Sequence, residues 1–409
     1  MPVLMLLVFL AMTTLALADA LDDGMAKYNS GDLDGAMAAF NQAIEQDTGN
    51  AYAYIGRGGV EVRKGELDRA MADFNEAAEI NPTNPAVYKY RATAELYQKD
   101  FDASIADSDK ALALKPDDSQ VYYNRALAKQ SQNDFSGALA DYDKTIELSP
   151  EFGDAYNNRG NVKRSMHDYP GSMADLSKAI ELVPGNADVY FNRALTEKAL
   201  GNSDAAISDF TKAIELKPGR VEAYINRGNV RKHQGDVDGA LSDYNKAIEL
   251  KPEDPFGYIG RGNLEQASSN FDNALADFSK AIALNPQYAL SYNNRGWCAY
   301  FKGDYDATIS DTTRAIELDP SLGYSYGTRG WARYSKGDVA GALADCKKAV
   351  QLEGAGTPDA AGDEGMLEFI QGNYTKAVTC WEAAIQNDPS VKNLIQPWID
   401  KARAKLKTS

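Results

Sequence analysis

The sequence predicts an all-α protein built as a solenoid of stacked helix pairs, and three observations support this fold class. Residue types recur every 34 positions along the 409-residue chain, as they do in stacked structural repeats. Each repeat carries two runs of apolar residues at helical spacing. A short turn separates the two runs, and a proline follows the second. Each repeat is therefore expected to form an antiparallel helix pair.

The 34-residue period is clearest at one arginine and one proline position. The arginines are Arg57, Arg91, Arg125, Arg159, Arg193, Arg227, Arg261, Arg295 and Arg329. The prolines are Pro82, Pro116, Pro150, Pro184, Pro218, Pro252, Pro286 and Pro320. Because no insertion breaks this register, the repeats form one array in which each unit packs only on its neighbours.

Residues 187–220 show how one repeat folds, and Ala187 is numbered as position one. Apolar and small residues between 189 and 199 predict the first helix, and a Gly-Asn turn follows it. A second apolar set predicts a helix over 204–216. Pro218 ends this helix, because proline cannot continue the hydrogen-bond ladder and disfavours helix in the residue before it.

The residues at fixed positions carry a family resemblance. Position four is aromatic (Tyr54, Tyr88 and Tyr122 in the first three regular repeats), positions eight, 20 and 27 are small, and position 32 is proline. This pattern resembles the tetratricopeptide repeat family. The resemblance implies a right-handed superhelix of about eleven helix-turn-helix repeats, and it implies little about the ligand.

The chain divides into five expected segments. Residues 1–20 resemble a signal peptide, and 21–50 form a degenerate first repeat. Nine regular repeats occupy 51–356, and a degenerate last repeat occupies 357–391. Residues 392–409 are expected to cap the array, because their apolar positions recur at helical spacing and an array must not end on an exposed apolar face.

The first segment predicts export. The chain is apolar from Val3 to Leu17 and then offers small-x-small cleavage sites, although no basic residue precedes the apolar run. The mature chain is expected to begin near Asp19 or Leu21, in the periplasm or outside the cell. The alternative is a protein anchored by this segment without cleavage. After removal of the segment, we expect no stable membrane insertion.

Composition argues against several classes of function. The net charge of −16 disfavours nucleic-acid binding, which needs a basic surface. Cys298, Cys346 and Cys380 follow no metal or redox spacing. His167, at a turn, and His233, near a helix end, have no nucleophile or metal-ligand partner at helical spacing. We therefore expect no enzyme activity, no cofactor and no metal.

An aspartate accompanies the repeating arginine. Arginine stands at position seven and aspartate at position 23 of the same nine repeats: Asp73, Asp107, Asp141, Asp175, Asp209, Asp243, Asp277, Asp311 and Asp345. These positions are equidistant from the turn at position 15, so they face each other across the helix pair. In the end units both residues change, to Asp23 with Ala39 and to Glu364 with Cys380. We predict partly buried structural ion pairs; the alternative is a row of arginines that faces a ligand.

Position six repeats an asparagine, which helix propensity does not explain. The residues are Asn124, Asn158, Asn192, Asn226 and Asn294. They resemble the asparagine ladder in the repeat domain of O-linked N-acetylglucosamine transferases, where such amides hold the backbone of an extended peptide. A side-chain amide both donates and accepts hydrogen bonds, so it suits peptide groups of any sequence. The alternative is local hydrogen bonding to a neighbouring helix.

Positions nine and 12 extend the candidate peptide-binding groove. The middle repeats place Asn161, Asn229, Asn263, Arg164, Lys198 and Lys232 there. The later repeats place Trp297, Trp331, Tyr300 and Tyr334 at the same positions. Because these positions are polar elsewhere, we expect the aromatic residues to lie outside the core and to anchor a peptide. The carboxylate clamp of co-chaperone repeat domains is not reproduced, because Lys89 is present but Thr93 replaces the expected amide.

These features favour a scaffold or adaptor that binds extended peptide segments of other proteins. The alternative is a regulatory or carbohydrate-handling subunit of an envelope enzyme complex, which would stack sugar rings on the tryptophans and tyrosines. That alternative requires a pair of carboxylates beside the aromatic residues, and the sequence does not reveal one. A structural spacer with an incidental groove is a third possibility.

Overall fold

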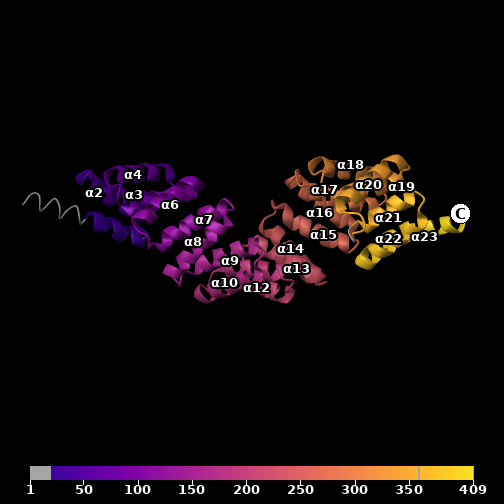
Figure 1. The fold of residues 1–409 in the computed structure, drawn as a ribbon, viewed down its shortest axis with the longest axis horizontal. Helices are drawn as coiled ribbons and strands as arrows, with labels where there is room; N and C mark the ends of the chain where they lie inside the picture. The colour runs from indigo at the N-terminus through magenta and orange to yellow at the C-terminus, as the bar shows by residue number, and fades with distance from the viewer. Residues whose placement is uncertain (1–19, 358–359, 409) are drawn as a thin grey trace, which may run out of the picture. The chain divides into compact units, whose positions relative to one another are not determined.

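The computed structural model describes residues 20–357 and 360–408. The chain divides into two compact units, Met1–Gly201 and Asn202–Ser409. The described residues form helices joined by turns, and they contain no β-strand (Figure 1). The all-α solenoid predicted from the sequence is therefore confirmed. The predicted signal peptide lies almost wholly outside the described residues.

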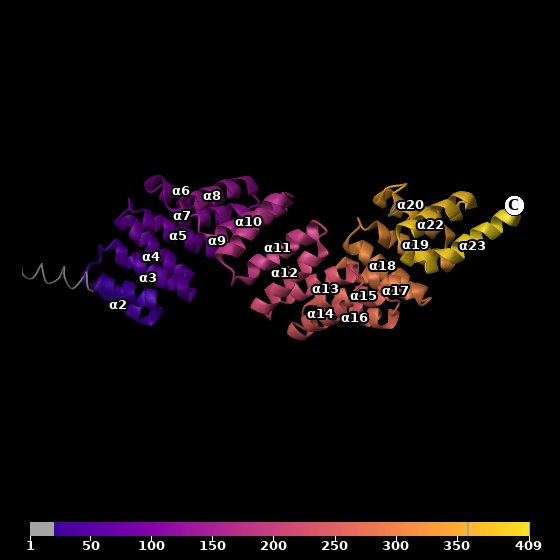
Figure 2. The same cartoon turned by 90° about the horizontal axis from the view of Figure 1, so that it is seen from below.

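The first unit is a succession of helix pairs. Residues 20–30 are helical. The helices that follow are α2 (Leu33–Gln46), α3 (Ala51–Lys64), α4 (Leu67–Ile80), α5 (Pro85–Gln98), α6 (Phe101–Leu114), α7 (Ser119–Ser131), α8 (Phe135–Leu148), α9 (Gly153–Ser165), α10 (Tyr169–Leu182) and α11 (Ala187–Ala199). The two helices of a pair pack together, as α5 packs on α6, and the first helices of successive pairs also touch, as α5 touches α7 (Figure 2).

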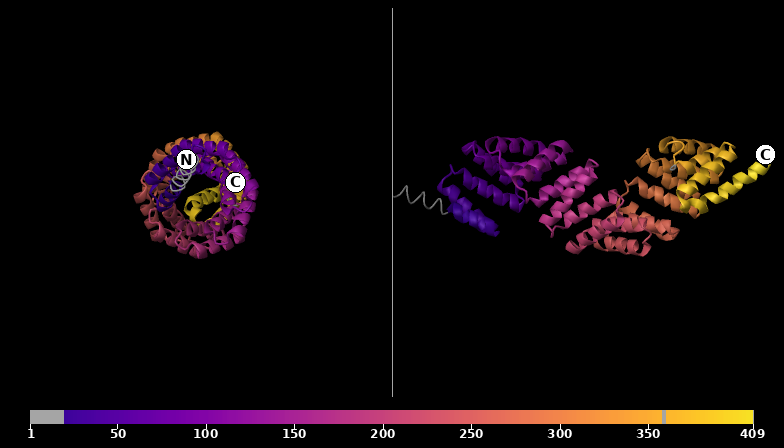
Figure 3. Two further views of the ribbon diagram at one scale, coloured as in Figure 1. Left: turned by 90° about the vertical axis from the view of Figure 1, so that its left-hand side faces the viewer. Right: turned by 60° about the horizontal axis from the view of Figure 1, so that its bottom comes forward.

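The second unit continues the same arrangement. Its helices are α12 (Ser203–Leu216), α13 (Val221–His233), α14 (Val237–Leu250), α15 (Pro255–Ala267), α16 (Phe271–Leu284), α17 (Ala289–Phe301), α18 (Tyr305–Leu318), α19 (Gly323–Ser335), α20 (Val339–Glu353), α21 (Ala361–Ile370), α22 (Tyr374–Asn387), the 3₁₀ turn η1 (Pro389–Val391) and α23 (Lys392–Thr408). The last helix, α23, packs against α22 (Figure 3). Of the helices that the structure describes, none combines the length and the apolar character that a membrane span needs.

The turn at position 15 is left-handed in every regular repeat. The expected glycines Gly65, Gly201, Gly235, Gly303 and Gly337 have φ between 77° and 90°. The other four repeats place Lys99, Asn133, His167 and Ser269 at this position, with φ of 62° or 63°. A left-handed residue ends a helix by redirecting the chain, and glycine adopts it without a steric penalty. The left-handed turn therefore forms in every regular repeat, whether or not the residue at position 15 is glycine.

The core is a row of small clusters along each unit. Phe74, Tyr244 and Phe278 at position 24 are fully buried. The small residue at position eight lies against them: a Cβ built on Gly58 would be 2.6 Å from Cε1 of Phe74. Because a close-packed interior tolerates little added volume, position eight must stay small beside a large ring.

The arginines and aspartates form a ladder of two-pronged ion pairs. In the pair of Arg159 with Asp175, Nε donates to Oδ2 at 2.8 Å and Nη2 donates to Oδ1 at 2.6 Å. The same geometry joins Arg57–Asp73, Arg91–Asp107, Arg125–Asp141, Arg227–Asp243, Arg261–Asp277, Arg295–Asp311 and Arg329–Asp345. The predicted ion pair is confirmed in these eight repeats. The ninth predicted pair would join Arg193 of the first unit to Asp209 of the second, so the ladder is described within each unit by the other eight pairs.

Each arginine also reaches the preceding repeat, which was not predicted from the sequence. Nη1 of Arg57 donates to Oδ1 of Asn41 at 2.8 Å, and Nη1 of Arg159 donates to Oδ1 of Asp143 at 2.6 Å. These acceptors occupy position 25 of the repeat before. In the eight described pairs the guanidinium carbon also lies 5.4–5.9 Å from the centre of the tyrosine ring at position four. One guanidinium therefore ties together three helices.

Position 11 sets the charge beside the buried aspartate. Four repeats place a cation there, and Lys129, Lys163, Arg231 and Arg333 each form an ion pair with the aspartate of their own repeat at 2.7–2.8 Å. Two repeats near the N-terminus place Glu61 and Glu95 there instead, each only 6% exposed. Burial and the neighbouring aspartate raise the pKa of both glutamates to about 7. These two repeats thus bury a carboxyl group where four others place a partly buried cation.

Removal of one ladder aspartate should destabilise the first unit. Asp175 is 4% exposed and also accepts from Lys163, so Asp175→Ala leaves two cations without their buried partner. We expect a loss of ~3–5 kcal/mol in the free energy of unfolding, measured by chemical denaturation. The control is Lys178→Ala on the same helix, whose exposed pair with Glu181 contributes ~1 kcal/mol or less. Equal losses in the two variants would contradict a structural role for the ladder.

The buried Glu61 should make stability depend on pH. A carboxyl group with a pKa near 4.5 in the unfolded chain and about 7 in the folded chain binds protons more tightly when folded. Its contribution to stability therefore falls as the pH rises from 4.5 to 7. Glu61→Gln should raise stability at pH 8, by on the order of 1–3 kcal/mol, and change it little at pH 4. The control is the exposed Glu76→Gln; an unchanged pH profile in Glu61→Gln would refute this assignment.

Candidate peptide-binding site

The position-six asparagines all donate hydrogen bonds within the protein. Nδ2 of Asn158 donates to the hydroxyl of Tyr123 at 2.8 Å, and Nδ2 of Asn192 donates to Oδ1 of Asn157 at 2.9 Å. The other donations run from Asn124 to Thr93, from Asn294 to Asn263 and from Asn226 to the carbonyl of Glu222. In four of the five, the acceptor lies on the first helix of the preceding repeat. Each of these amide groups thus donates to a neighbouring group of the protein, as the alternative of local hydrogen bonding expects. Their contact with a peptide remains a prediction.

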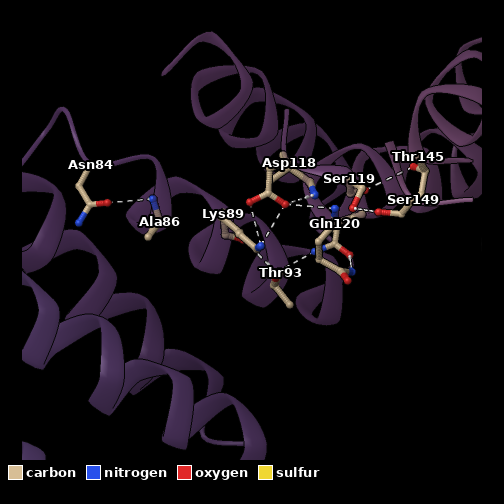
Figure 4. A network of polar contacts seen from close by, with 11 residues as sticks. Asn84, Ala86, Lys89, Thr93, Asp118, Ser119, Gln120, Thr145 and Ser149 are labelled. Carbon is tan, nitrogen blue, oxygen red and sulfur yellow. Dashed lines mark hydrogen bonds and ion pairs between the residues drawn. The ribbon is translucent and has the colours of Figure 1, made fainter. Parts of the chain in front are cut away.

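A polar network around Lys89 and Asp118 joins α5 to α7 (Figure 4). Nζ of Lys89 lies 3.0 and 2.9 Å from the two carboxylate oxygens of Asp118, which also accepts from the backbone N–H of Gln120. The side chain of Gln120 in turn donates to Oδ1 of Asn124 at 3.0 Å, while Nδ2 of Asn124 donates to Thr93. Because each of these groups has a partner inside the first unit, the network holds helices together.

The predicted basic and amide residues at positions nine and 12 are divided between the units. Burial lowers the pKa of Arg164 and Lys198 in the first unit and of Lys232 in the second. Nε of Arg164 and Oδ1 of Asn161 are buried without a hydrogen bond among the described residues. Asn229 accepts from a core tyrosine hydroxyl at 2.8 Å. Neither unit contains all three cations, so no single basic site is described.

Two of the predicted aromatic anchors belong to the core, which corrects the sequence-based expectation. Tyr300 is 7% exposed and Trp331 is 3% exposed, and both lie in the largest hydrophobic cluster of the second unit. The reason is the C-terminal helix: the ring of Trp398 on α23 lies 5.8 Å from Trp331 and 5.6 Å from Tyr334. Trp297 and Tyr334 remain partly exposed. Sequence reasoning could not place α23 over these residues.

A cavity of about 490 Å³ lies in the second unit between α17, α19 and the C-terminal elements. Asn294 and Trp297 of α17 line it, together with Trp331 of α19. Leu394 and Ile395 of α23 form part of its apolar wall. Three predicted site residues, Asn294, Trp297 and Trp331, therefore meet in one cavity, whereas Tyr300 and Tyr334 are not among its lining residues.

Asp363 is a lining residue that the sequence did not single out. It accepts from Nε1 of Trp331 at 2.7 Å, and burial raises the pKa of its carboxyl to about 6. It lies in the segment 354–365, which is the one break in the regular composition of the repeats. Its register could have identified it: Glu364 stands at position seven of the last repeat, so Asp363 occupies position six, which carries asparagine in five other repeats.

A smaller hollow of about 260 Å³ lies in the first unit. Tyr28, Tyr52 and Tyr90 line it, and so do Gly56 and Gly59. Its described lining residues carry no charge. Gly56 replaces the position-six asparagine and lies against the core ring of Phe40, since a Cβ built on it would be 2.4 Å from Cε1 of that ring.

Comparisons with known proteins identify the repeats. One family model, described as tetratricopeptide repeat, matches residues 21–85, 91–151, 123–187 and 259–323, which together exceed half of the chain. Two further models with the same description match 187–220 and 221–254. No curated protein matches the chain in sequence.

Solved structures with similar folds are distant in sequence. A tetratricopeptide repeat protein from Parabacteroides merdae is 18% identical with a TM-score of 0.50, and the match covers 62% of this chain and 98% of that one. Yeast Tom70 is 19% identical with a TM-score of 0.45 and 96% coverage of both chains. PilF from Pseudomonas aeruginosa is 17% identical with a TM-score of 0.48, covering 55% and 99%. Similarity at this level concerns the fold alone.

The hydrogen bond between Asn158 and Tyr123 offers a test of what the amides do. If Asn158 serves packing, Asn158→Ala should lower stability by ~0.5–1.5 kcal/mol without any ligand present. Tyr123→Phe removes the acceptor hydroxyl, so the double variant should cost less than the sum of the two single variants, measured by chemical denaturation. Strictly additive losses would mean that this hydrogen bond contributes nothing to the fold.

Proposed function

We propose, from the premise that this chain belongs to the tetratricopeptide repeat family, that it is a non-enzymatic scaffold which binds a peptide segment of another protein in the cavity of the second unit. Family membership supports a role in protein interaction in general. The observation that supports this cavity is its content: a partly exposed Trp297, the side-chain amides of Asn293 and Asn294, and an apolar wall.

The cavity offers each type of contact that a peptide needs. Trp297 presents ring surface, and a buried aromatic anchor supplies much of the binding energy in protein interfaces. The amide of Asn293 is bonded to Asn294 and Ser325, whereas the partly exposed amide of Asn294 keeps one N–H beyond the one that it donates to Asn263, and its oxygen can accept a second hydrogen bond. Leu394 and Ile395 provide apolar surface for a side chain. These five lining residues lie on helices, so little conformational entropy is lost when the peptide binds.

A carbohydrate-handling subunit remains the second candidate. That candidate requires a pair of carboxylates beside the aromatic residues, and the cavity lining contains Glu353, Asp363 and Asp388. Two observations favour a peptide instead. Asp363 is hydrogen-bonded to Trp331, and Trp331 is only 3% exposed, so of the two tryptophans in the lining only Trp297 offers a ring face on which a sugar could stack.

We further propose that the scaffold acts after export, in the periplasm or outside the cell. The support is the apolar run of the first twenty residues and the cleavage sites that follow it. The partners would then be envelope or secreted proteins. Anchoring by an uncleaved N-terminal segment is the alternative.

The test is selection of peptides from a displayed library of random linear 12-residue peptides on the full chain. We expect selected peptides to lose affinity in Trp297→Ala by roughly 30-fold or more, the usual effect of an anchor residue. The control is Phe256→Ala, which removes an exposed aromatic side chain from α15 outside the cavity. Both variants are first compared with the wild type by circular dichroism.

Two results would contradict the proposal. One is the absence of any enriched peptide, and the other is equal affinity in Trp297→Ala and Phe256→Ala. Enrichment on a glycan array, with loss in Trp297→Ala, would favour the carbohydrate candidate instead.

A further inference from the structure

The cavity of the second unit is acidic. Among its described lining residues, Glu353, Asp363 and Asp388 carry carboxyl groups, and none is lysine, arginine or histidine. Along the ladder the buried carboxylates are paired, since each of eight ladder aspartates faces an arginine of its own repeat. The described lining of the cavity thus contains carboxyl groups and no cationic side chain, in contrast to the ladder.

Asp363 shows this contrast most clearly. Its described polar partner is the indole N–H of Trp331 at 2.7 Å, and no lysine or arginine of the described chain forms an ion pair with it. Burial raises the pKa of this carboxyl to about 6. A partly buried carboxylate that is held by one neutral donor has capacity for a cationic partner.

The aromatic lining suits the same partner. Trp297 is partly exposed, and Tyr324 is 44% exposed at the rim. A lysine or arginine side chain gains from the face of a tryptophan or tyrosine ring. The second unit already contains this interaction on its own surface, where Nζ of Lys401 lies 4.1 Å from the ring centre of Trp398.

Size and long-range charge agree with a basic peptide segment. A volume of about 490 Å³ holds one long side chain together with part of the backbone that carries it. The net charge of −16 attracts basic segments before contact. A neutral or acidic ligand would cover the carboxylate of Asp363 without supplying a cation, which costs binding free energy.

We propose that this cavity recognises a lysine or arginine side chain of the bound peptide, with Asp363 as the carboxylate partner and Trp297 as the aromatic face. This inference rests on the proposed peptide-binding function and adds the chemical class of the anchor residue. Asn294 and the apolar wall of α23 then contact the flanking backbone and side chains.

The test uses three libraries of 12-residue peptides that differ only in a fixed central residue: arginine, norleucine or glutamate. Binding to the full chain is measured at low and high salt. We expect the arginine library to bind roughly 10- to 100-fold more tightly than the norleucine library, the range of one charge-assisted hydrogen bond. This preference should shrink at high salt, and the glutamate library should bind most weakly.

The matched variants are Asp363→Asn and Asp238→Asn. Asparagine keeps an oxygen that can accept from Trp331, so Asp363→Asn retains that contact while it removes the charge. It should abolish the preference for arginine over norleucine. Asp238 is exposed on α14 outside the cavity, and its variant should keep the preference.

The outcomes separate this inference from the proposed function. Equal binding of the arginine and norleucine libraries, with loss in Trp297→Ala, would leave peptide binding in place and overturn the cationic anchor. Persistence of the arginine preference in Asp363→Asn would also overturn it. Failure of all three libraries to bind would contradict both. If Asp363→Asn does not fold, the salt dependence of the wild-type chain decides. An arginine preference that shrinks at high salt supports the cationic anchor, and one that salt does not change overturns it.

Discussion

The guanidinium group at position seven is the contact on which the rest of the array depends. It forms a two-pronged ion pair across its own helix pair, donates to position 25 of the preceding repeat and lies near the tyrosine ring of position four. Burial of these aspartates is tolerated because the guanidinium supplies both a charge and directed hydrogen bonds. The same group therefore sets the geometry within a repeat and between repeats.

The contacts within a repeat could be predicted, and those between repeats could not. Arginine and aspartate lie at equal distances from the turn, so helix geometry alone brings Arg159 and Asp175 together. Contact of Arg159 with Asp143 depends on how one pair stacks on the next, which spacing does not reveal. The same limit applies to the amide of Asn158, whose acceptor Tyr123 lies on the neighbouring pair.

Only the part of the candidate site that lies at repeating positions could be predicted from the sequence. Asn294 and Trp297 were identified because they occupy the repeating inward positions, and they do line the cavity. Trp331 and Tyr300 are buried because α23 returns over them, and a single helix outside the repeat has no register from which its docking could be inferred. Asp363 stands at position six, where five other repeats have asparagine. Because it is a carboxylate and not an amide, a search for repeating asparagines did not identify it.

The acceptor that the arginine finds in the preceding repeat is not one residue type. The nine residues that accept from an arginine Nη1 are Asn41, Asn75, Asp109, Asp143, Ser177, Thr211, Asn245, Ser279 and Thr313. A short side chain with an oxygen is sufficient, so any regular unit can follow any other without a matched pair of substitutions. Duplication or loss of a whole 34-residue unit would therefore leave each new junction with a working contact. The length of such an array can change by gene rearrangement while the fold of each unit is preserved.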